Sequence, residues 1–355
     1  MEPKEPTDYY KKVLTLKDLV PGDILIFEGD KDDFASKMIM KFTNSKVSHS
    51  AMYFQDSPVT ALADSGTKGL RVHEVGTKQS LRRVFVSRIA KPGNKEFFSD
   101  KELLPVLQAA KVYLDEKTDY PYGDLLALAL TILFGKASFG YFDLVKVTKA
   151  LVALFKLLLD TIAYHGKHPM VCSSFVYQCY MDASKKDASG KYKDLKLDVE
   201  NGDIKKVKQG ALQQENTPST LFDLYAQYVV ENNLHTMSLT SVEEDEAEEE
   251  LSIEKIEALF EDALLENGKE LTALPKIGDA RSLILKLLKK VAQLMKVPVD
   301  TLNELINELR NMQSLFVTPN DLCYNVTNTV KIGYIDIERK EDNLPDNLIT
   351  TKYNT

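Results

Sequence analysis

The sequence has few cysteines and no excess of basic charge. Its three cysteines in 355 residues, Cys172, Cys179 and Cys323, are too few and too unevenly spaced for a disulfide scaffold. An odd number of cysteines leaves at least one free thiol, which favours a reducing compartment. The formal net charge is −8, whereas nucleic-acid binding needs clustered Lys and Arg against the phosphates. We therefore expect no nucleic-acid partner.

Long apolar runs are also missing. The longest uncharged apolar run, residues 125–135, has 11 residues, whereas a membrane-spanning helix needs about 20. We therefore expect no transmembrane segment. Residues 1–12 contain no apolar segment, so no secretory signal is visible there. This predicts a cytoplasmic protein, or one that is exported without a visible signal peptide.

At 44% hydrophobic, the chain can form one large domain or two ordinary ones. The first third contains short apolar runs bounded by Pro, Gly, Asp and Ser, which are typical of strands. These runs are residues 19–29, 48–64, 69–76 and 82–90, and the second divides into two strands at Asp56–Ser57. The first third therefore predicts a small antiparallel sheet.

Helical spacing of apolar residues follows the predicted sheet. The spacing predicts helices from about residue 101, near 123–134, near 141–164, and from Cys172 to about 183. Residues 184–210 have little to bury and are expected to form a loop. Thr217 is the predicted N-cap of a further helix that ends near residue 232.

The last third predicts a small helical bundle followed by a strand. Segments 252–267, 279–296 and 300–313 each carry an apolar stripe. Residues 243–250, seven of them acidic, precede these stripes and are interpreted as a solvated linker, with a partner-binding acidic patch as the alternative. A strand-like pattern returns only at residues 329–339.

Cys172 is the candidate for chemistry, because a helix N-terminus and a nearby imidazole together lower the pKa of a thiol. His49 lies on a predicted strand, and a two-residue turn at 56–57 would place Asp64 directly opposite it. A carboxylate there can fix the imidazole tautomer. The same turn would pair Met52 with Ala61 and Phe54 with Val59 on the other face. The alternative is that Cys172 is a buried inert thiol, as we expect for Cys179.

Five motifs occur in one order along the chain, namely "PGDILIF", "SHSAMYF", "ADSGTKGLRV", "YPYGD" after a helix, and "VCSSFV". This order resembles the circularly permuted papain-like hydrolases of the NlpC type, in which the histidine precedes the cysteine. The lecithin:retinol acyltransferase group shares that permuted fold. The resemblance covers about residues 20–183 and implies an α+β fold, a small antiparallel sheet or barrel packed on helices, with an additional all-α region.

The resemblance also implies roles for particular residues. Cys172 would be the nucleophile, His49 the base and Asp64 the third polar residue. Because similar proteins usually have Glu in the third place, Glu74 is the alternative. Tyr122 matches a tyrosine that borders the pocket, with an ordinary packing role as its alternative, and Ser173 is placed in the same pocket.

Neither a metal nor another cofactor is expected. His165 and His168 precede Cys172, but no second pair of ligands at zinc-site spacing accompanies them.

The resembling family tends to end in a "TP-x-D-L" turn followed by a strand that rejoins the sheet. "TPNDL" at 318–322 fits, since residues 329–339 follow it, and a one-residue bulge near Gly333 and Tyr334 would gather their apolar side chains on one face. This predicts a catalytic domain at 1–184 with an apolar helical insertion at about 123–165. Residues 185–315 would form a helical insertion or second domain, and 316–355 the returning strand and a tail.

The predicted function is a thiol hydrolase that cleaves a peptide or isopeptide amide bond through an acyl-enzyme at Cys172. The apolar helices at 123–164 motivate a second hypothesis, a lipid acyltransferase or lipase with the same thiol, because broadly apolar helices beside a site suit acyl chains. The substrate is thus expected to be a peptide or a lipid-like acyl compound. The third hypothesis is a non-enzymatic scaffold, with the helical region 251–315 binding a protein partner.

Overall fold

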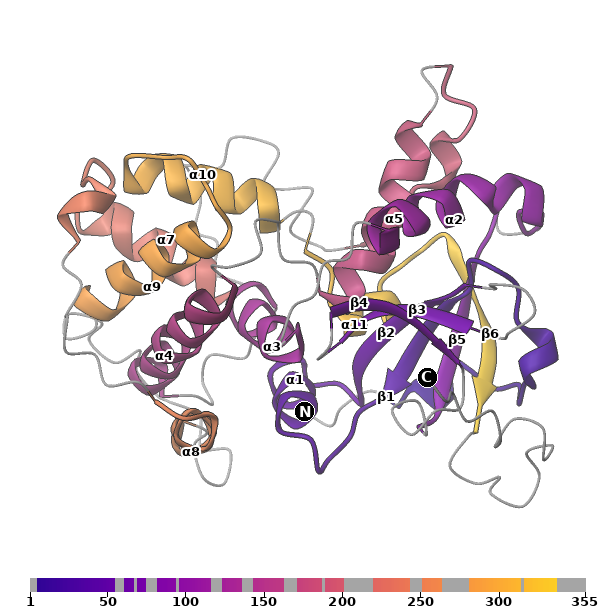
Figure 1. Ribbon diagram of the computed structural model, residues 1–355, viewed down its shortest axis with the longest axis horizontal. Coiled ribbons are helices and arrows are strands. Elements are labelled where there is room, and N and C mark those ends of the chain that lie inside the picture. Colours follow the sequence, from indigo (N-terminus) through magenta and orange to yellow (C-terminus); the bar gives the residue numbers. More distant parts are fainter. Residues whose placement is uncertain are drawn as a thin grey trace, which may run out of the picture.

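A six-stranded antiparallel sheet and a group of helices form the two halves of the molecule, at the right and left of Figure 1. The computed structural model describes residues 5–54, 61–66, 69–74, 82–93, 96–115, 123–135, 143–162, 171–186, 189–200, 220–242, 251–263, 281–313 and 316–336. The protein is therefore α+β, as the sequence predicts.

The sheet has the strand order β4-β3-β2-β1-β5-β6, and every neighbouring pair is antiparallel. Its strands are β1 (Ile24–Glu28), β2 (Val47–Tyr53), β3 (Ala61–Gly66), β4 (Gly69–Glu74), β5 (Val84–Ile89) and β6 (Thr329–Ile335). Each strand coincides with an apolar run identified in the sequence. The predicted small antiparallel sheet is confirmed.

Both faces of the sheet are buried, which explains the unbroken apolar run of β1. Ile24 and Ile26 pack on one face with helices α2 (Asp100–Asp115) and α5 (Cys172–Lys185). Leu25 and Phe27 point to the other face, which is covered by N-terminal leucines that include Leu14. We call these the helix face and the leucine face.

The helical half is built around one apolar core. Its helices are α1 (Phe34–Thr43), α3 (Gly123–Phe134), α4 (Leu144–Ile162), α7 (Leu221–Glu231), α8 (Ile253–Ala263), α9 (Arg281–Leu294) and α10 (Leu302–Gln313). Helix α4 packs against α8 and α9, and α3 packs against α1 and α7. The bundle predicted for the last third is thus joined by the two apolar helices that precede Cys172 in the sequence.

Helix α3 is apolar all round because it is buried all round. Every side chain from Leu125 to Phe134 is buried. A helix with this environment needs no lipid to cover it. None of the helices in the described part of the chain is long and apolar enough to cross a membrane.

One helix start differs from the sequence prediction, and two helices were not predicted. Helix α7 is capped by Thr220, whose hydroxyl accepts from the Asp223 backbone N–H, and not by Thr217. "TPNDL" begins the short helix α11 (Pro319–Tyr324) and is not a turn. Helix α1 was missed, although Asp33 caps its N-terminus and Asn44 ends it in the left-handed conformation. Both residue types are ordinary signals for helix ends.

The chain returns to the sheet through β6, which pairs with β5. The predicted return is therefore confirmed. Val86 pairs with Gly333 and Ser87 with Lys331, so Ile332 is the extra residue of a bulge. This bulge lets Ile332 and Ile335 both pack on the leucine face.

The outer edge of β6 is covered by the N-terminal segment. The Leu14 N–H donates to the Tyr334 carbonyl at 2.8 Å, and the Tyr334 N–H donates to the Lys12 carbonyl at 2.8 Å. At Gly333 a Cβ would collide with that Lys12 carbonyl, so the close approach of the two segments requires glycine. The N-terminal segment thus satisfies backbone groups that a sheet edge otherwise leaves unpaired.

The sheet half extends farther along the chain than predicted. Leu195 and Leu197 are buried in the core of the helix face, and Val199 forms a bridge with Val326. The chain therefore stays with the sheet at least to residue 200, beyond the predicted boundary at 184. The boundary at 315 stays a prediction, and the acidic segment 243–250 lies outside the described residues.

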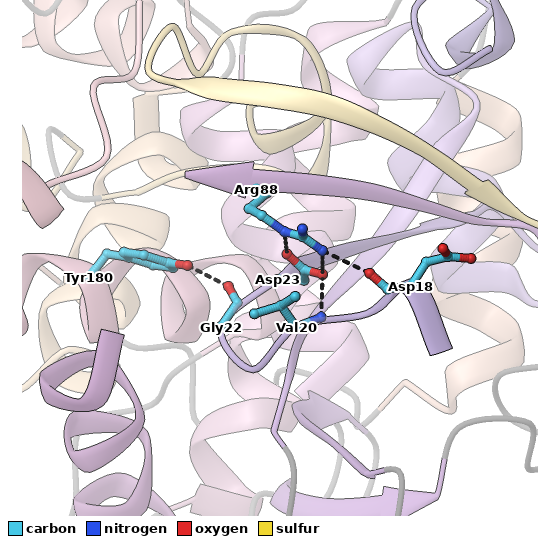
Figure 2. Close-up of polar contacts among 6 residues, drawn as sticks. All are labelled: Asp18, Val20, Gly22, Asp23, Arg88 and Tyr180. Carbon is cyan, nitrogen blue, oxygen red and sulfur yellow. Dashed lines mark hydrogen bonds and ion pairs between the residues drawn. The ribbon is translucent and has the colours of Figure 1, made fainter. Parts of the chain in front are cut away.

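A buried ion pair joins β1 to β5 (Figure 2). Arg88 donates to both carboxylate oxygens of Asp23, at 2.7 and 2.8 Å, and also to the Asp18 carbonyl at 2.9 Å. The Val20 N–H donates to the same Asp23 carboxylate at 2.8 Å, and the Tyr180 hydroxyl of α5 donates to the Gly22 carbonyl. Burial raises the pKa of Asp23, and the hydrogen bonds from Arg88 and Val20 offset part of that rise. The "PGD" motif is therefore a structural junction of β1, β5 and α5.

Replacing Arg88 with methionine is expected to destabilise the protein by about 3 kcal/mol at pH 7, because it leaves a buried carboxylate without its partner. A carboxyl whose folded-state pKa is raised stabilises the fold only at low pH, so the deficit should shrink as the pH falls and Asp23 is protonated. Urea unfolding at neutral and acidic pH measures this. Lys111→Met, at an exposed pair with Asp115, is the control and should change little. An equal deficit at both pH values would contradict the prediction.

Removing residues 316–355 is expected to unfold the sheet half, because β6 and α11 bury side chains on both faces of the sheet. Thermal melting of the truncated chain measures this. A melt like that of the full chain would show that the C-terminal segment is dispensable.

Candidate functional site

Cys172 is the first residue of α5. Val171 precedes it with an extended backbone and no side-chain cap, and its carbonyl accepts from the Phe175 N–H at 2.8 Å. The first backbone N–H groups of a helix have no partner within the helix, and the helix dipole favours negative charge there. An oxyanion formed beside Cys172 would therefore be stabilised by the start of α5.

The other two thiols are held neutral by burial. Desolvation raises the pKa of Cys179 well above its ordinary value, and it raises the pKa of Cys323 to about 11. Both side chains lie in the core of the helix face, which confirms the expectation that Cys179 is a core residue. Cys172 is also buried, at 1% exposure, but it belongs to a helix terminus and not to that core.

His49 lies on β2 and pairs with Phe27 of β1. The two rings are 5.5 Å apart between centroids, and the Arg82 guanidinium lies 5.7 Å from the Phe27 ring. His49 is partly buried. Because Phe27 belongs to the leucine face, the imidazole projects from that face.

Cys172 and His49 lie on neighbouring elements, since α5 packs against β2 and β3. The body of α5, however, packs on the helix face, where Met52 lies, and alternation along β2 assigns His49 to the leucine face. A contact between the sulfur and the imidazole therefore requires the first residue of α5 to reach around the end of β2. The predicted dyad stays a prediction.

Helix α1 packs against β2 and contributes to the core of the helical half. Val171 belongs to the same core as Met38 and Phe42 of α1. At the start of β2, the Ser48 and Ser36 hydroxyls form a buried hydrogen bond of 2.5 Å. The sequence prediction missed this serine pair because it missed α1.

The predicted β2–β3 register is wrong by two residues. Met52 pairs with Ala63 and Tyr53 with Leu62, whereas the two-residue turn would have paired Met52 with Ala61. The connection is therefore longer than two residues, and position 59, the predicted partner of Phe54, lies outside the described residues. Extended along both strands, this register places Asp64 diagonal to His49 and not directly opposite. Its role as the third residue stays a prediction.

The register removes Glu74 as a direct partner of His49. Met52, Ala63 and Val72 form one row across β2, β3 and β4. Glu74 lies two residues from Val72 on one side of this row. His49 lies three residues from Met52 on the other side of it. Five residues of strand separate the two positions by about 16 Å. That span is too long for a carboxylate–imidazole hydrogen bond.

Ser173 is buried beside Cys172, whereas Tyr122, His165 and His168 lie outside the described residues. One polar atom on β2 was not anticipated, the Ser50 hydroxyl, which is fully buried and has no hydrogen-bond partner among the residues that the structure describes. Within the described ranges, no group of three or more His, Cys, Asp and Glu side chains is arranged to hold a metal ion.

No protein-family model matches the chain, and no curated protein matches it. Among solved structures, the chain is similar to the metalloprotein YiiX from Escherichia coli O157:H7, described as DUF1105, at 16% identity. The match covers 46% of this chain and 65% of that protein, less than two thirds of its length, with a TM-score of 0.28.

The register predicts different effects for the two acidic candidates. Asp64→Asn is expected to slow alkylation of Cys172 about tenfold or more at neutral pH, because the imidazole loses the group that orients it. Glu74→Gln is the matched control and should leave the rate unchanged. Peptide mass spectrometry after timed iodoacetamide treatment gives both rates. The reverse pattern would contradict the observed β2–β3–β4 register.

Proposed function

We propose that the protein is a cysteine hydrolase of the circularly permuted papain-like type, with Cys172 as its nucleophile and an amide as its substrate. The observation that carries this proposal is the position of Cys172, at the N-terminus of a helix that packs against the strands of His49 and Asp64. The motif order from "PGDILIF" to "VCSSFV" and the return of β6 to the sheet support the same fold.

The reaction needs three functions from these residues. His49 accepts the proton of the Cys172 thiol, and the sulfur attacks the carbonyl carbon of the amide. The backbone N–H of Cys172 donates to the oxyanion that forms. His49 then returns the proton to the leaving amine, and water hydrolyses the thioester, which frees the acid and the thiol. Asp64 would orient the imidazole.

Access to the sulfur sets a condition on the substrate. Cys172 is 1% exposed, so an acyl group reaches it only when neighbouring side chains move. Substrate binding that moves them also excludes water from the sulfur, which strengthens the electrostatic stabilisation there.

The lipid hypothesis loses the observation that motivated it. The apolar helices α3 and α4 bury their side chains in the helical half, so their composition follows from packing. A lipid acyltransferase or lipase, and a scaffold without activity, are therefore alternative outcomes of the experiment.

Iodoacetamide is expected to alkylate Cys172 faster than Cys179 and Cys323 at pH 7, because burial keeps the other two as thiols. His49→Asn should slow that alkylation and reduce amide hydrolysis by about 100-fold or more. A peptide panel and a phospholipid panel, each with Cys172→Ser as the blank, identify the bond that is cleaved.

Three results would count against the proposal. Equal alkylation of the three cysteines would make Cys172 an ordinary thiol. Cleavage of phospholipid esters alone would support the lipid alternative. Selective alkylation without turnover of either panel would support the scaffold.

A further inference from the structure

A cationic side chain lies on the leucine face close to His49. Phe27 of β1 pairs with His49 on one side and with Val84 on the other, so the three residues form one row across the sheet. Arg82 lies two residues before Val84 and therefore points to the same face. Its guanidinium lies 5.7 Å from the centre of the Phe27 ring, and the His49 ring lies 5.5 Å from that centre. One aromatic ring thus has both the guanidinium and the proposed base as neighbours.

The guanidinium of Arg82 has no acidic partner in the described part of the chain. Within these residues its side chain forms no ion pair. The two other arginines of this segment are paired, Arg83 with Asp336 at 3.4 Å and Arg88 with Asp23 at 2.7 Å. Arg82 therefore keeps its N–H donors for a group that the protein itself does not supply there.

Solvent reaches both polar groups of this row. Arg82 and His49 are partly exposed, whereas Phe27 is 1% exposed. Glu28, the acidic residue of β1, follows Phe27 and therefore points to the opposite face. A ligand that approaches His49 on the leucine face thus meets a positive charge that Glu28 does not neutralise from the same face.

The chemistry of a stacked arginine indicates what it binds. A guanidinium that lies over an aromatic ring keeps the N–H groups of its planar edge, and these match the two oxygens of a carboxylate. Contact with the ring also restricts the side chain, so less conformational entropy is lost when a ligand binds. Peptides carry carboxylates at the C-terminus and on Asp and Glu, which makes an acidic peptide the matching amide substrate.

We propose that Arg82 binds a carboxylate of the substrate and thereby selects acidic peptides for the site of Cys172 and His49. The inference rests on the proposed hydrolase and names its substrate class. The guanidinium donates two hydrogen bonds to the carboxylate, and the bond to be cleaved lies on the His49 side of Phe27. Arg82 takes no part in proton transfer, so its effect is on binding.

Two alkylating reagents test the charge preference without a known substrate. Iodoacetate and iodoacetamide both alkylate a thiolate at their CH2 group, but only iodoacetate carries a carboxylate. Peptide mass spectrometry after timed treatment of the full chain gives both rates at Cys172. Arg82→Met keeps the stem of the side chain and removes its charge, and it should lower the ratio of the iodoacetate rate to the iodoacetamide rate about fivefold.

Three variants control for charge and folding. Arg281→Met removes an exposed arginine from α9 in the helical half and should leave the ratio unchanged. Arg82→Lys keeps the positive charge and should keep most of the ratio. Thermal melts report the folding of each variant, and Arg82→Gln replaces Arg82→Met if the methionine variant does not fold.

A pair of peptides tests the same preference in turnover. For a peptide that the enzyme cleaves, versions with Glu and with Gln beside the cleaved bond are compared. Arg82→Met should raise KM for the Glu version about tenfold with little change in kcat, because a charged hydrogen bond made in both the bound and the transition state is lost. The Gln version should be affected about twofold or less.

The outcomes distinguish this inference from the proposed function. Alkylation of Cys172 no faster than that of Cys179 and Cys323 would refute the hydrolase itself. Selective alkylation of Cys172 by iodoacetamide, with an iodoacetate ratio that Arg82→Met and Arg281→Met leave equal, would overturn the role of Arg82 and leave the hydrolase standing. Equal KM changes for the Glu and Gln peptides would overturn it as well.

Discussion

The ion pair between Asp23 and Arg88 is the interaction on which the arrangement of the sheet half depends (Figure 2). Asp23 is 1% exposed, and a carboxylate so deeply buried is tolerated only when its oxygens are hydrogen-bonded. Arg88 supplies two of those bonds and the backbone of Val20 a third. The turn before β1 is thereby tied to β5. A buried pair contributes little net stability but makes other arrangements of its neighbours costly.

Helix α5 takes its position from the same turn. The Tyr180 hydroxyl donates to the Gly22 carbonyl, one residue before Asp23. Gly22 also donates its N–H to the Tyr53 carbonyl at the end of β2. The last half of α5 is thus attached to the sheet, whereas Val171 at its start packs in the core of the helical half. Cys172 therefore lies where the two cores meet, and side chains from both halves can shape access to its sulfur.

The sequence predicts most elements but not the geometry between them. Apolar alternation and helical spacing identified the strands and most helices, because burial imposes both patterns. The return of β6 and its bulge were also predicted, since Ile332 and Ile335 share a face only with an extra residue. The β2–β3 register was wrong because strand alternation does not fix the length of a connection, and two residues of slip preserve the face of every side chain. That slip moved Asp64 from opposite His49 to a diagonal position.

Asp23 and Lys331 show two outcomes of burying an ionisable group in the same sheet half. For Asp23, hydrogen bonds to Arg88 oppose the desolvation, and the group completes a junction. For Lys331, no carboxylate of the described residues opposes the desolvation, and the charged form becomes less stable. Keeping such a lysine beside β5 costs stability that an apolar side chain would not. Burial in this half thus disfavours the charged form of both groups, and only Asp23 has hydrogen bonds that offset the effect.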